Sequence, residues 1–482
     1  MKYQWVALSV TTVGIFMSGL DTRIVLIGLP IIAESLRTDL ETALWLTQGY
    51  QIALTIGLLF LGRFTDIFGR VKLYIIGFVV FTVGSGLCVV AANGQQLILF
   101  RIIQGFGGAC LILNSAAIIT DATPSEDLGF ALGVNQIGWT AGAVSGLTVG
   151  GLLIDTLGWR VIFLINVPVG IFATLWAHHR LREISKREAH SSFDYAGLAI
   201  FTSSLTLLLI AISLDTMDLI SRLTSAFLYV VCLVMLIAFV YLEPRTREPL
   251  LDMRLFKNRL FSSGNISQFL YSLGFGALSL ILIIYFELIR GYDALTSGLL
   301  LIPWDVAFIC IGPISGRLSD RYGTRFFTML GLGIGGLCFV VAALMLSASL
   351  PIWKVEVLLV VFGLGQGLFS SPNISSVMGS VPRERHGVAS GVRATMFNAG
   401  SVVSIGLVAY AITTAIPYHV GSEIITGGYT SLTVGDATGF MTGISRAFIV
   451  AAVITFVAMF ASSLRGVESK GGITLRSTAV ES

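Results

Sequence analysis

The chain has 482 residues, of which 55% are hydrophobic and 12% are charged, and its mean hydropathy is +0.87. Soluble domains carry about twice that charged fraction, so the composition excludes an ordinary water-soluble domain. The net charge of +3 and the lack of a basic cluster in the sequence also exclude nucleic acid as a partner.

Apolar stretches long enough to cross a hydrocarbon core of about 30 Å recur along the whole chain. They predict an all-α integral membrane protein with about 14 transmembrane helices. The first stretch is too long for the core of a signal peptide and lacks a cleavage site, so we expect it to remain as a span. The expected spans are 6–32, 43–62, 72–92, 96–120, 129–153, 160–178, 194–214, 222–242, 262–287, 296–316, 326–347, 353–378, 388–414 and 442–463.

The positions of lysine and arginine predict the orientation, because these residues are enriched in cytoplasmic loops. They gather at both termini and in the loops after the second, sixth, eighth, tenth and twelfth spans, whereas the alternate loops hold few of them. We therefore expect a multi-pass protein of the cell membrane with both termini in the cytoplasm.

Charged linkers bracket the seventh and eighth spans, and removing this pair leaves six spans on either side. We expect an N-terminal six-helix bundle over 1–180 and an inserted transmembrane helix pair with its linkers over 181–255. A C-terminal six-helix bundle should follow over 256–465, and a cytoplasmic tail over 466–482.

A short charged turn occurs in both halves. "GRFTDIFGRV" at 62–71 and "GRLSDRYGTR" at 316–325 each lie between the second and third span of a half. The repetition indicates two homologous halves. Because both copies are expected on the cytoplasmic side, the halves should be parallel repeats, an arrangement known among secondary transporters.

These turns resemble the G-x-x-x-D-R-x-G-R-[KR] signature of the major facilitator superfamily. The resemblance covers nearly the whole chain and implies a major facilitator fold, two six-helix bundles plus an inserted helix pair. It further implies proton-coupled export of small hydrophobic or amphiphilic compounds by alternating access. The segments similar to motifs of the fourteen-spanner drug:proton antiporter (multidrug efflux) branch are "LDTRIVLIGLP" (20–30), "WLTQGY" (45–50), "RIIQGFGGA" (101–109), "WRVIFLINVPVG" (159–170) and "PLLDMRLFKNR" (249–259).

By this resemblance the repeated turns form a cytoplasmic gate that is closed in one conformation. Glycine permits a tight turn, and aspartate can cap a helix N-terminus or pair with arginine. The alternative is a loop whose positive charge only directs topology. The candidate gate residues are Gly62, Asp66, Gly69, Arg70, Gly316, Asp320, Arg321 and Gly323.

Proton coupling requires a group that titrates inside the membrane, and a carboxyl group withdrawn from water can do so near neutral pH. Asp21 lies near the middle of the first span, and Asp305 lies in the tenth. Arg101 in the fourth span should face a cavity or a carboxylate, because an intramembrane arginine is costly. The resemblance implies coupling roles for Asp21 and Arg101, and Asp305 is a further candidate. A static ion pair is the alternative.

Polar residues on several spans are candidates for a cavity wall, because a few polar groups orient ligands in apolar sites. Individually, such amides are more often helix–helix hydrogen bonds. The central spans contain three arginines, Arg23, Arg101 and Arg393, but only two carboxylates, Asp21 and Asp305. This charge balance suits neutral or anionic compounds at least as well as cationic dyes. The candidate cavity residues are Arg23, Gln48, Tyr50, Gln104, Asn135, Gln136, Asn166, Gln268, Asn373, Arg393 and Asn398.

Gly138, Gly142, Gly146 and Gly150 recur every four residues in the fifth span, which predicts close packing against another helix. The stretch resembles the antiporter motif, but Leu147 stands where a proline is expected. This departure keeps open a proton-symporting or facilitative metabolite carrier.

No Walker sequence or nucleophile motif occurs in the sequence. We therefore expect a transporter, not an enzyme, driven by a proton gradient without cofactor or metal. The expected partners are a small-molecule substrate and the lipid bilayer, with the protein as a monomer. A non-transporting receptor or scaffold on the same fold is a further alternative. We expect the five cysteines to be small core residues: Cys88, Cys110, Cys232, Cys310 and Cys338.

Overall fold

The computed structural model describes residues 3–38, 40–124, 128–184, 195–216, 220–245, 253–381, 386–413, 415 and 434–465. Within these ranges every regular element is helical. The tail at 466–482 and much of the two linkers flanking the inserted pair lie outside the described residues.

Long apolar helices form both halves. The N-terminal half contains α1 (Tyr3–Leu36), α2 (Leu40–Phe68), α3 (Arg70–Val89), α4 (Gly94–Ala122), α5 (Leu128–Leu157), α6 (Val161–Leu164) and α7 (Asn166–Arg180). The inserted pair is α8 (Tyr195–Thr216) and α9 (Arg222–Leu242), followed by the short turns η1 (Glu243–Arg245) and η2 (Met253–Lys257). The C-terminal half contains α10 (Arg259–Phe275), α11 (Leu278–Ile284), the π-helical turn η3 (Tyr285–Ile289), α12 (Ala294–Tyr322), α13 (Thr324–Met345), α14 (Ile352–Gly379), α15 (His386–Thr413) and α17 (Val434–Ser463).

Twelve of these spans are long and apolar enough by themselves to cross a membrane, counting α6 with α7 and α10 with α11 and η3. The helices α2 and α8, with 29 and 22 residues, are also of membrane length. The described part thus has the all-α, fourteen-spanner architecture that the sequence predicts. Three predicted ends were wrong, since α2 continues to Phe68, α12 continues to Tyr322 and α17 already begins at Val434. These three helices extend beyond their apolar windows into more polar residues.

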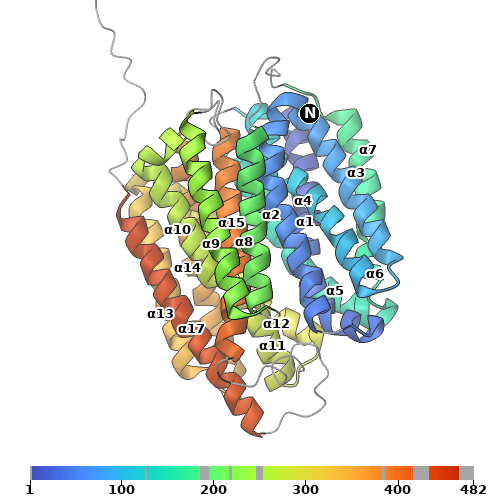
Figure 1. Cartoon of the computed structure of the whole chain (residues 1–482), viewed down its shortest axis with the longest axis vertical. Helices are drawn as coiled ribbons and strands as arrows, with labels where there is room; N and C mark the ends of the chain where they lie inside the picture. Colours follow the sequence, from blue (N-terminus) through green and yellow to red (C-terminus); the bar gives the residue numbers. More distant parts are fainter. Residues whose placement is uncertain are drawn as a thin grey trace, which may run out of the picture.

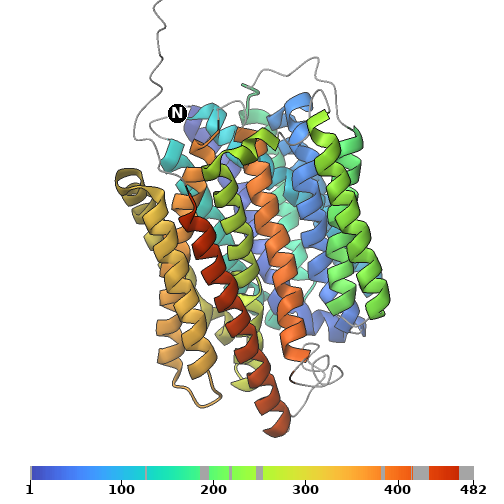
Figure 2. The same ribbon diagram turned by 60° about the vertical axis from the view of Figure 1, so that its left-hand side comes forward.

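The helices run side by side along the long axis of the molecule (Figure 1). In the N-terminal half α1 packs on α5, and α4 packs on α2 and α3; in the C-terminal half α12 packs on α14, and α13 on α14 and α17. The inserted pair lies over the seam between the halves, because α8 contacts α9, α2 of one half and α15 of the other. Figure 2 shows α8 and α9 along one flank of the bundle.

The repeated turns have the same backbone conformation. Gly69, between α2 and α3, has φ 97° and ψ 143°, and Gly323, between α12 and α13, has φ 94° and ψ 144°. Positive φ values of this kind favour glycine. Both turns lie at the end of the bundle that holds the N-terminus and the last residues of α17 (Figure 1). We call this end the basic end, after Arg70 and Arg321 beside the two turns.

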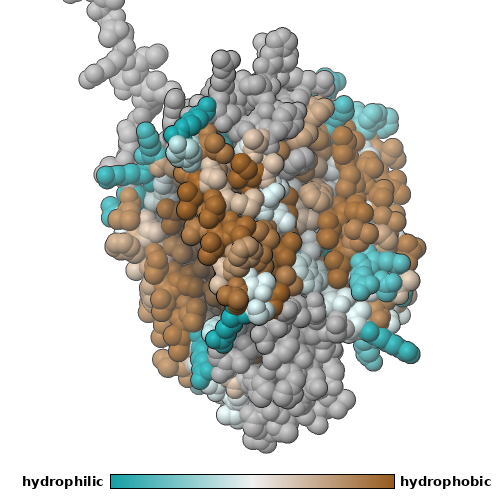
Figure 3. All heavy atoms as spheres, viewed as in Figure 1, coloured by the Kyte–Doolittle hydropathy of each residue, from teal (hydrophilic) through white to brown (hydrophobic). Residues whose placement is uncertain are grey.

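Hydrophobic side chains cover much of the flank, and hydrophilic ones concentrate toward its ends (Figure 3). On α9, Phe227, Val234 and Ile237 are 66%, 59% and 60% exposed. An apolar surface of this extent suits lipid rather than water. Cys310 is also exposed, which corrects the expectation that every cysteine lies in the core; the other four are buried.

Candidate functional site

An ion pair is buried inside the N-terminal half, between α1 and α4. Arg101 Nη1 lies 2.5 Å from Asp21 Oδ2, and the two side chains are 2% and 0% exposed. Opposite charges within a membrane bundle compensate each other and avoid the cost of an isolated charge in hydrocarbon. The structure thus brings together two predicted coupling residues from helices that are distant in sequence.

Amide side chains complete this pair. Gln104 Nε2 donates to Asp21 Oδ1 at 2.8 Å and to Ser85 Oγ at 2.6 Å, and its Oε1 accepts from Arg101 Nη1 at 2.6 Å. Asn166 Nδ2 at the start of α7 donates to Asp21 Oδ1 at 3.1 Å. The carboxylate therefore receives hydrogen bonds from three side chains on two helices. Such a satisfied network holds a single arrangement.

An aromatic ring on α2 packs against the arginine of the pair. The guanidinium carbon of Arg101 lies 4.1 Å from the centre of the Tyr50 ring, a cation–π distance. A Cβ atom at Gly105 would lie 2.6 Å from the Tyr50 carbonyl oxygen, so α2 and α4 approach this closely only because residue 105 is glycine. The predicted cavity residues Tyr50, Gln104 and Asn166 thus surround Asp21 and Arg101.

A second group of charged residues lies between the two halves, on α1 and α12. Arg23 on α1 is 5.6 Å from the ring centre of Trp304 on α12, whose Nε1 donates to Gln366 Oε1 on α14 at 2.8 Å. The neighbouring Asp305 is 6% exposed and forms no hydrogen bond or ion pair with any described residue. Asp305 is therefore separate from the Asp21–Arg101 pair.

Helices α5 and α12 also meet between the halves, close to this group. A Cβ atom at Gly298 of α12 would lie 2.9 Å from the Leu147 carbonyl oxygen of α5. A Cβ atom at Gly151 would lie 3.3 Å from the backbone of Leu295. These contacts are at the start of α12 and the end of α5, so the halves touch at the end of the bundle opposite the basic end.

A third polar group lies wholly within the C-terminal half. Asn373 Nδ2 donates to Gln268 Oε1 at 3.1 Å, and Asn373 Oδ1 accepts from Arg465 just beyond α17. Gln268 also approaches Ser272 Oγ at 3.4 Å. Two predicted cavity residues are therefore hydrogen-bonded to each other.

The remaining cavity candidates do not form one cluster. Asn135 accepts from Ser115 Oγ at 3.2 Å, and Asn398 bonds to the carbonyl of Ala394 in its own helix at 2.8 Å. Arg393 makes no hydrogen bond or ion pair with the described residues, and its Nε is buried. Of the other two, Gln48 is buried and Gln136 is half-buried.

The glycines of α5 lie against the backbone of α1. A Cβ atom would be 2.6 Å from Thr12 at Gly138 and 2.1 Å from the Phe16 carbonyl oxygen at Gly142. The corresponding distance to the Leu20 oxygen is 2.5 Å at Gly146, and that to Ile24 is 2.6 Å at Gly150. The four glycines thus follow one line of contact with α1.

The two repeated turns differ in their side-chain partners. Arg70 Nη1 lies 2.5 Å from Asp121 Oδ1 of α4, and Glu183 accepts from the backbone N–H groups of Arg70 and Val71 at 3.0 Å each. In the second turn Thr324 occupies the position equivalent to Arg70.

The structure describes few side-chain contacts for the other gate candidates. Arg321 lies 5.5 Å from the ring centre of Tyr322, and a Cβ atom at Gly316 would lie 2.7 Å from Ser371 Oγ. Gly62, Asp66 and Asp320 are described only as helical backbone positions, and their side-chain surroundings lie outside the described part.

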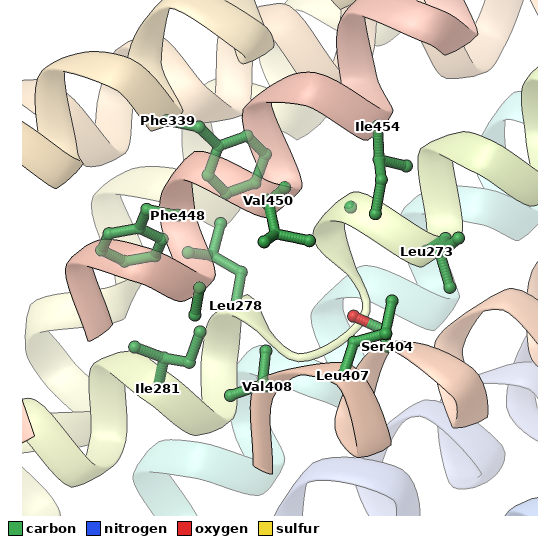
Figure 4. Close-up of a pocket in the computed structure, with 13 residues that line it drawn as sticks. Leu273, Leu278, Ile281, Phe339, Ser404, Leu407, Val408, Phe448, Val450 and Ile454 are labelled. Carbon is green, nitrogen blue, oxygen red and sulfur yellow. The ribbon is translucent and has the colours of Figure 1, made fainter. Parts of the chain in front are cut away.

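A small pocket lies in the C-terminal half where α10 breaks from α11 (Figure 4). Ser404 Oγ accepts from the backbone N–H of Ala277 at 3.0 Å and so gives this N–H group a partner where the helix is interrupted. Apart from Ser404, glycine and alanine, its lining consists of large apolar side chains such as Phe339 and Ile454, and no candidate site residue lines it. In the described ranges no three potential metal ligands lie together.

Sequence reasoning missed several residues of these groups. Trp304 stands between Pro303 and Asp305, and Gln366 is an amide within the glycine-rich "GLGQG" (363–367) of an apolar span; both were visible signals. Ser85 and Glu183 carry no such signal, because serine is common in membrane helices and Glu183 lies in a charged linker.

Comparisons with known proteins agree with this architecture. The sequence profile of the Major Facilitator Superfamily matches residues 11–405. The riboflavin transporter RibZ of Clostridioides difficile (strain 630) is 32% identical over 83% of this chain and 86% of its own length. Multidrug resistance protein 3 of Bacillus subtilis (strain 168) is 29% identical over 77% of this chain and 72% of its own.

Solved structures share the fold at low sequence identity. A bacterial homologue of the human lysosomal transporter Spinster, in an inward-facing and unoccupied conformation, matches with TM-score 0.65 and 15% identity over 96% of this chain and 97% of its own. The human organic anion transporter MFSD10 matches with TM-score 0.64 and 14% identity over 95% of this chain and 99% of its own.

Proposed function

Because the chain belongs to the major facilitator superfamily, whose members carry small molecules across membranes, we propose that it exports small hydrophobic or amphiphilic compounds in exchange for protons. The observation that carries this proposal is the Asp21–Arg101 pair with its amide partners. The pair places a carboxylate, sealed from water, inside a helix bundle. Intramembrane carboxylates of this kind are typical of proton pathways.

Proton binding would change the partners of this carboxylate. Protonation of Asp21 removes the charge that compensates Arg101 and converts one acceptor oxygen into a donor. Arg101 then retains Gln104 as its neighbour, and the bonds from α4 and α7 to α1 weaken. A conformational equilibrium between the halves can respond to such a change, because it shifts by the difference in free energy between its two states.

The basic end is proposed to be the cytoplasmic side, because arginines gather there. On this view Arg70, Asp121 and Glu183 form part of a cytoplasmic gate. They hold the start of α3, directly after the repeated turn. The gate must open in every cycle. The Arg70 and Asp121 side chains are 17% and 22% exposed, and ion pairs that water reaches are weaker than fully buried ones, which suits a gate.

The names of two relatives support an amphiphilic substrate. One relative is named a riboflavin transporter and another a multidrug resistance protein. Both names fit a site with few charges and several amides.

A proton-symporting or facilitative carrier is the second candidate, and one observation favours it. Helix α5 is an unbroken helix from Leu128 to Leu157, and Leu147 occupies the position where the antiporter motif has a proline. Proline in a helix interior causes a kink. Without it, α5 lacks the bend that the resembled exporters have.

Proton movement in liposomes containing the purified protein tests the proposal. A panel of cationic dyes, neutral amphiphiles and organic anions is added while internal pH is recorded, with Asp293→Asn as a control at the exposed start of α12. Coupled export predicts proton uptake or release with at least one class, and its loss in Asp21→Asn. Transport of a compound without proton movement would identify a facilitator. Parallel movement of proton and compound would identify a symporter.

A further inference from the structure

We propose that Arg23, Trp304 and Asp305 form a binding site for neutral planar compounds whose polar edge carries a hydrogen-bond acceptor beside a donor, as in a cyclic imide. The inference rests on the proposed function, since it names the class of compound and the residue at which that compound and the proton compete. It concerns the group between the halves and not the Asp21–Arg101 pair.

Two buried polar groups of opposite kind are left without partners here. Arg23 Nη1 and Asp305 Oδ2 are both inaccessible and form no hydrogen bond. A guanidinium only donates and a carboxylate only accepts. Leaving such groups unpaired is unfavourable, so a ligand that offers an acceptor to Arg23 and a donor to Asp305 satisfies both.

The charges of the site indicate that the ligand is neutral. Arg23 lies over the ring of Trp304, the residue before Asp305, yet no ion pair joins Arg23 to Asp305. One positive and one negative group balance each other, so a charged ligand would leave one of them uncompensated. By contrast, the atoms of Asp21 are already occupied by Arg101, Gln104 and Asn166.

Trp304 places an aromatic ring here, but its side chain is 2% exposed and packed in the core, so a compound reaches the ring only when the two halves move apart. Its indole N–H is held by Gln366, and its backbone is fixed against α14, where a Cβ atom at Gly363 would come within 2.2 Å of the Trp304 oxygen. Arg23 already lies over the ring at 5.6 Å. Aromatic rings favour offset stacking with other planar groups, which selects planar compounds.

The site includes residues from both halves, which suits a transported compound. Arg23 belongs to α1 and Asp305 to α12, next to the contact between Leu147 of α5 and Gly298 of α12. A compound bound between them contacts two bodies that move relative to each other. Its binding energy can therefore differ between the two conformations, as a transport cycle requires.

Protonation of Asp305 opposes binding of such a compound. The protonated carboxyl loses its charge and gains an O–H group, so it no longer offers the same acceptor to a ligand N–H. Arg23 is the charged side chain that acts on it. Charged residues on the elements packed against α12 lie near the ends of those elements: Asp155 on α5, Glu287 on η3, Arg325 on α13, and Lys354 and Glu356 on α14.

Binding of two matched probes tests the site. Lumiflavin is neutral and planar and has an imide N–H, and 3-methyllumiflavin differs by a methyl group on that nitrogen. Fluorescence quenching is measured with purified full-length protein in detergent micelles between pH 5 and pH 8. We expect lumiflavin to bind about tenfold or more tightly than its methyl derivative, because a hydrogen bond to a charged group is lost. Its affinity should fall with falling pH.

Variants assign the effect to the two residues. Asp305→Leu and Arg23→Gln should each weaken lumiflavin binding about tenfold or more, with the methyl derivative little affected by Asp305→Leu. Asp305→Asn is neutral and does not titrate, so at every pH it should bind lumiflavin about as weakly as the unaltered protein does at low pH, without pH dependence. Asp293→Asn, the same change at the exposed start of α12, should behave as the unaltered protein. Size-exclusion chromatography checks folding.

Equal affinities for the two probes in the unaltered protein would overturn the site, and this comparison requires no variant. Binding of organic anions in preference to lumiflavin would also overturn it. If the probes are not distinguished but other compounds still drive proton movement in liposomes, the site is wrong and the proposed function stands. If they are distinguished but no compound drives proton movement, the site stands and proton coupling is wrong.

Discussion

Asp21 Oδ2 accepts from Arg101 at 2.5 Å, while Asp21 Oδ1 accepts from Gln104 and Asn166 at 2.8 and 3.1 Å. One carboxylate on α1 therefore joins α4 and α7, and both of its oxygens are engaged. Arg393 on α15 shows the opposite situation, because it forms no ion pair with any described acid. The two arginines should respond differently to removal.

Arg101→Met should lower the free energy of unfolding by about 3–5 kcal/mol, because it leaves Asp21 buried without its counter-charge. Arg393→Met should leave stability unchanged or increase it, since no described acid loses a partner. Thermal unfolding of both variants in the same detergent checks the contrast. Equal losses would show that Arg393 has a compensating partner.

Gly142→Leu should disrupt the packing of α5 on α1, because even a Cβ atom there would lie 2.1 Å from the Phe16 oxygen. Overpacking costs about 1–3 kcal/mol or more. Gly133→Leu in the same helix is the matched control, since nothing lies within 4 Å of its added Cβ. The measurement is the thermal midpoint together with the yield of monodisperse protein. Similar behaviour of the two variants would contradict the packing.

Gly69→Ala and Gly323→Ala should each destabilise the protein by about 1–3 kcal/mol, because φ values of 97° and 94° strain any residue with a Cβ atom. Gly379→Ala adds the same methyl group at the end of α14, with no atom within 4 Å. It should have little effect. Thermal unfolding would refute the prediction if the three variants had the same midpoint.

Glu183→Gln should loosen the start of α3, because the carboxylate accepts from two backbone N–H groups at a helix N-terminus. Loss of such a cap costs about 0.5–2 kcal/mol. Hydrogen exchange at residues 70–73 should accelerate, with Glu356→Gln as a control on α14. Unchanged exchange would mean that other groups hold the end of α3.

Much of the fold could be predicted from the sequence. A span in lipid must satisfy its backbone N–H and C=O groups within its own helix, so each long apolar stretch indicates one helix. The ends were less accurate, as α2 and α17 show, since polar residues extend helices beyond the membrane. The intramembrane charges were also visible, because charged residues stand out in apolar stretches. Their partners were not, because the Asp21–Arg101 contact joins helices distant in sequence.

The contrast between Trp304 and Ser85 shows why parts of the sites were missed. Tryptophan in an apolar helix has many structural uses, and only the position of Arg23 on another helix gives Trp304 its contact here. Ser85 acts through a hydrogen bond to Gln104 that depends on the close approach of α3 and α4. Neither tertiary relation is encoded in a local pattern.

Asp21 and Arg23 on α1 each lie near an opposite charge that is synthesised at a different time. The counter-charge of Asp21 is Arg101 on α4. The carboxylate that the proposed site places with Arg23 is Asp305 on α12, which leaves the ribosome about two hundred residues after Arg101. A lone charge at the centre of a helix costs about 2.5–3.5 kcal/mol during insertion by the translocon. We therefore expect the N-terminal half to mature in the membrane with Arg23 still unmatched. Its biogenesis should then depend on the nascent C-terminal half or on an insertion chaperone that shields this arginine.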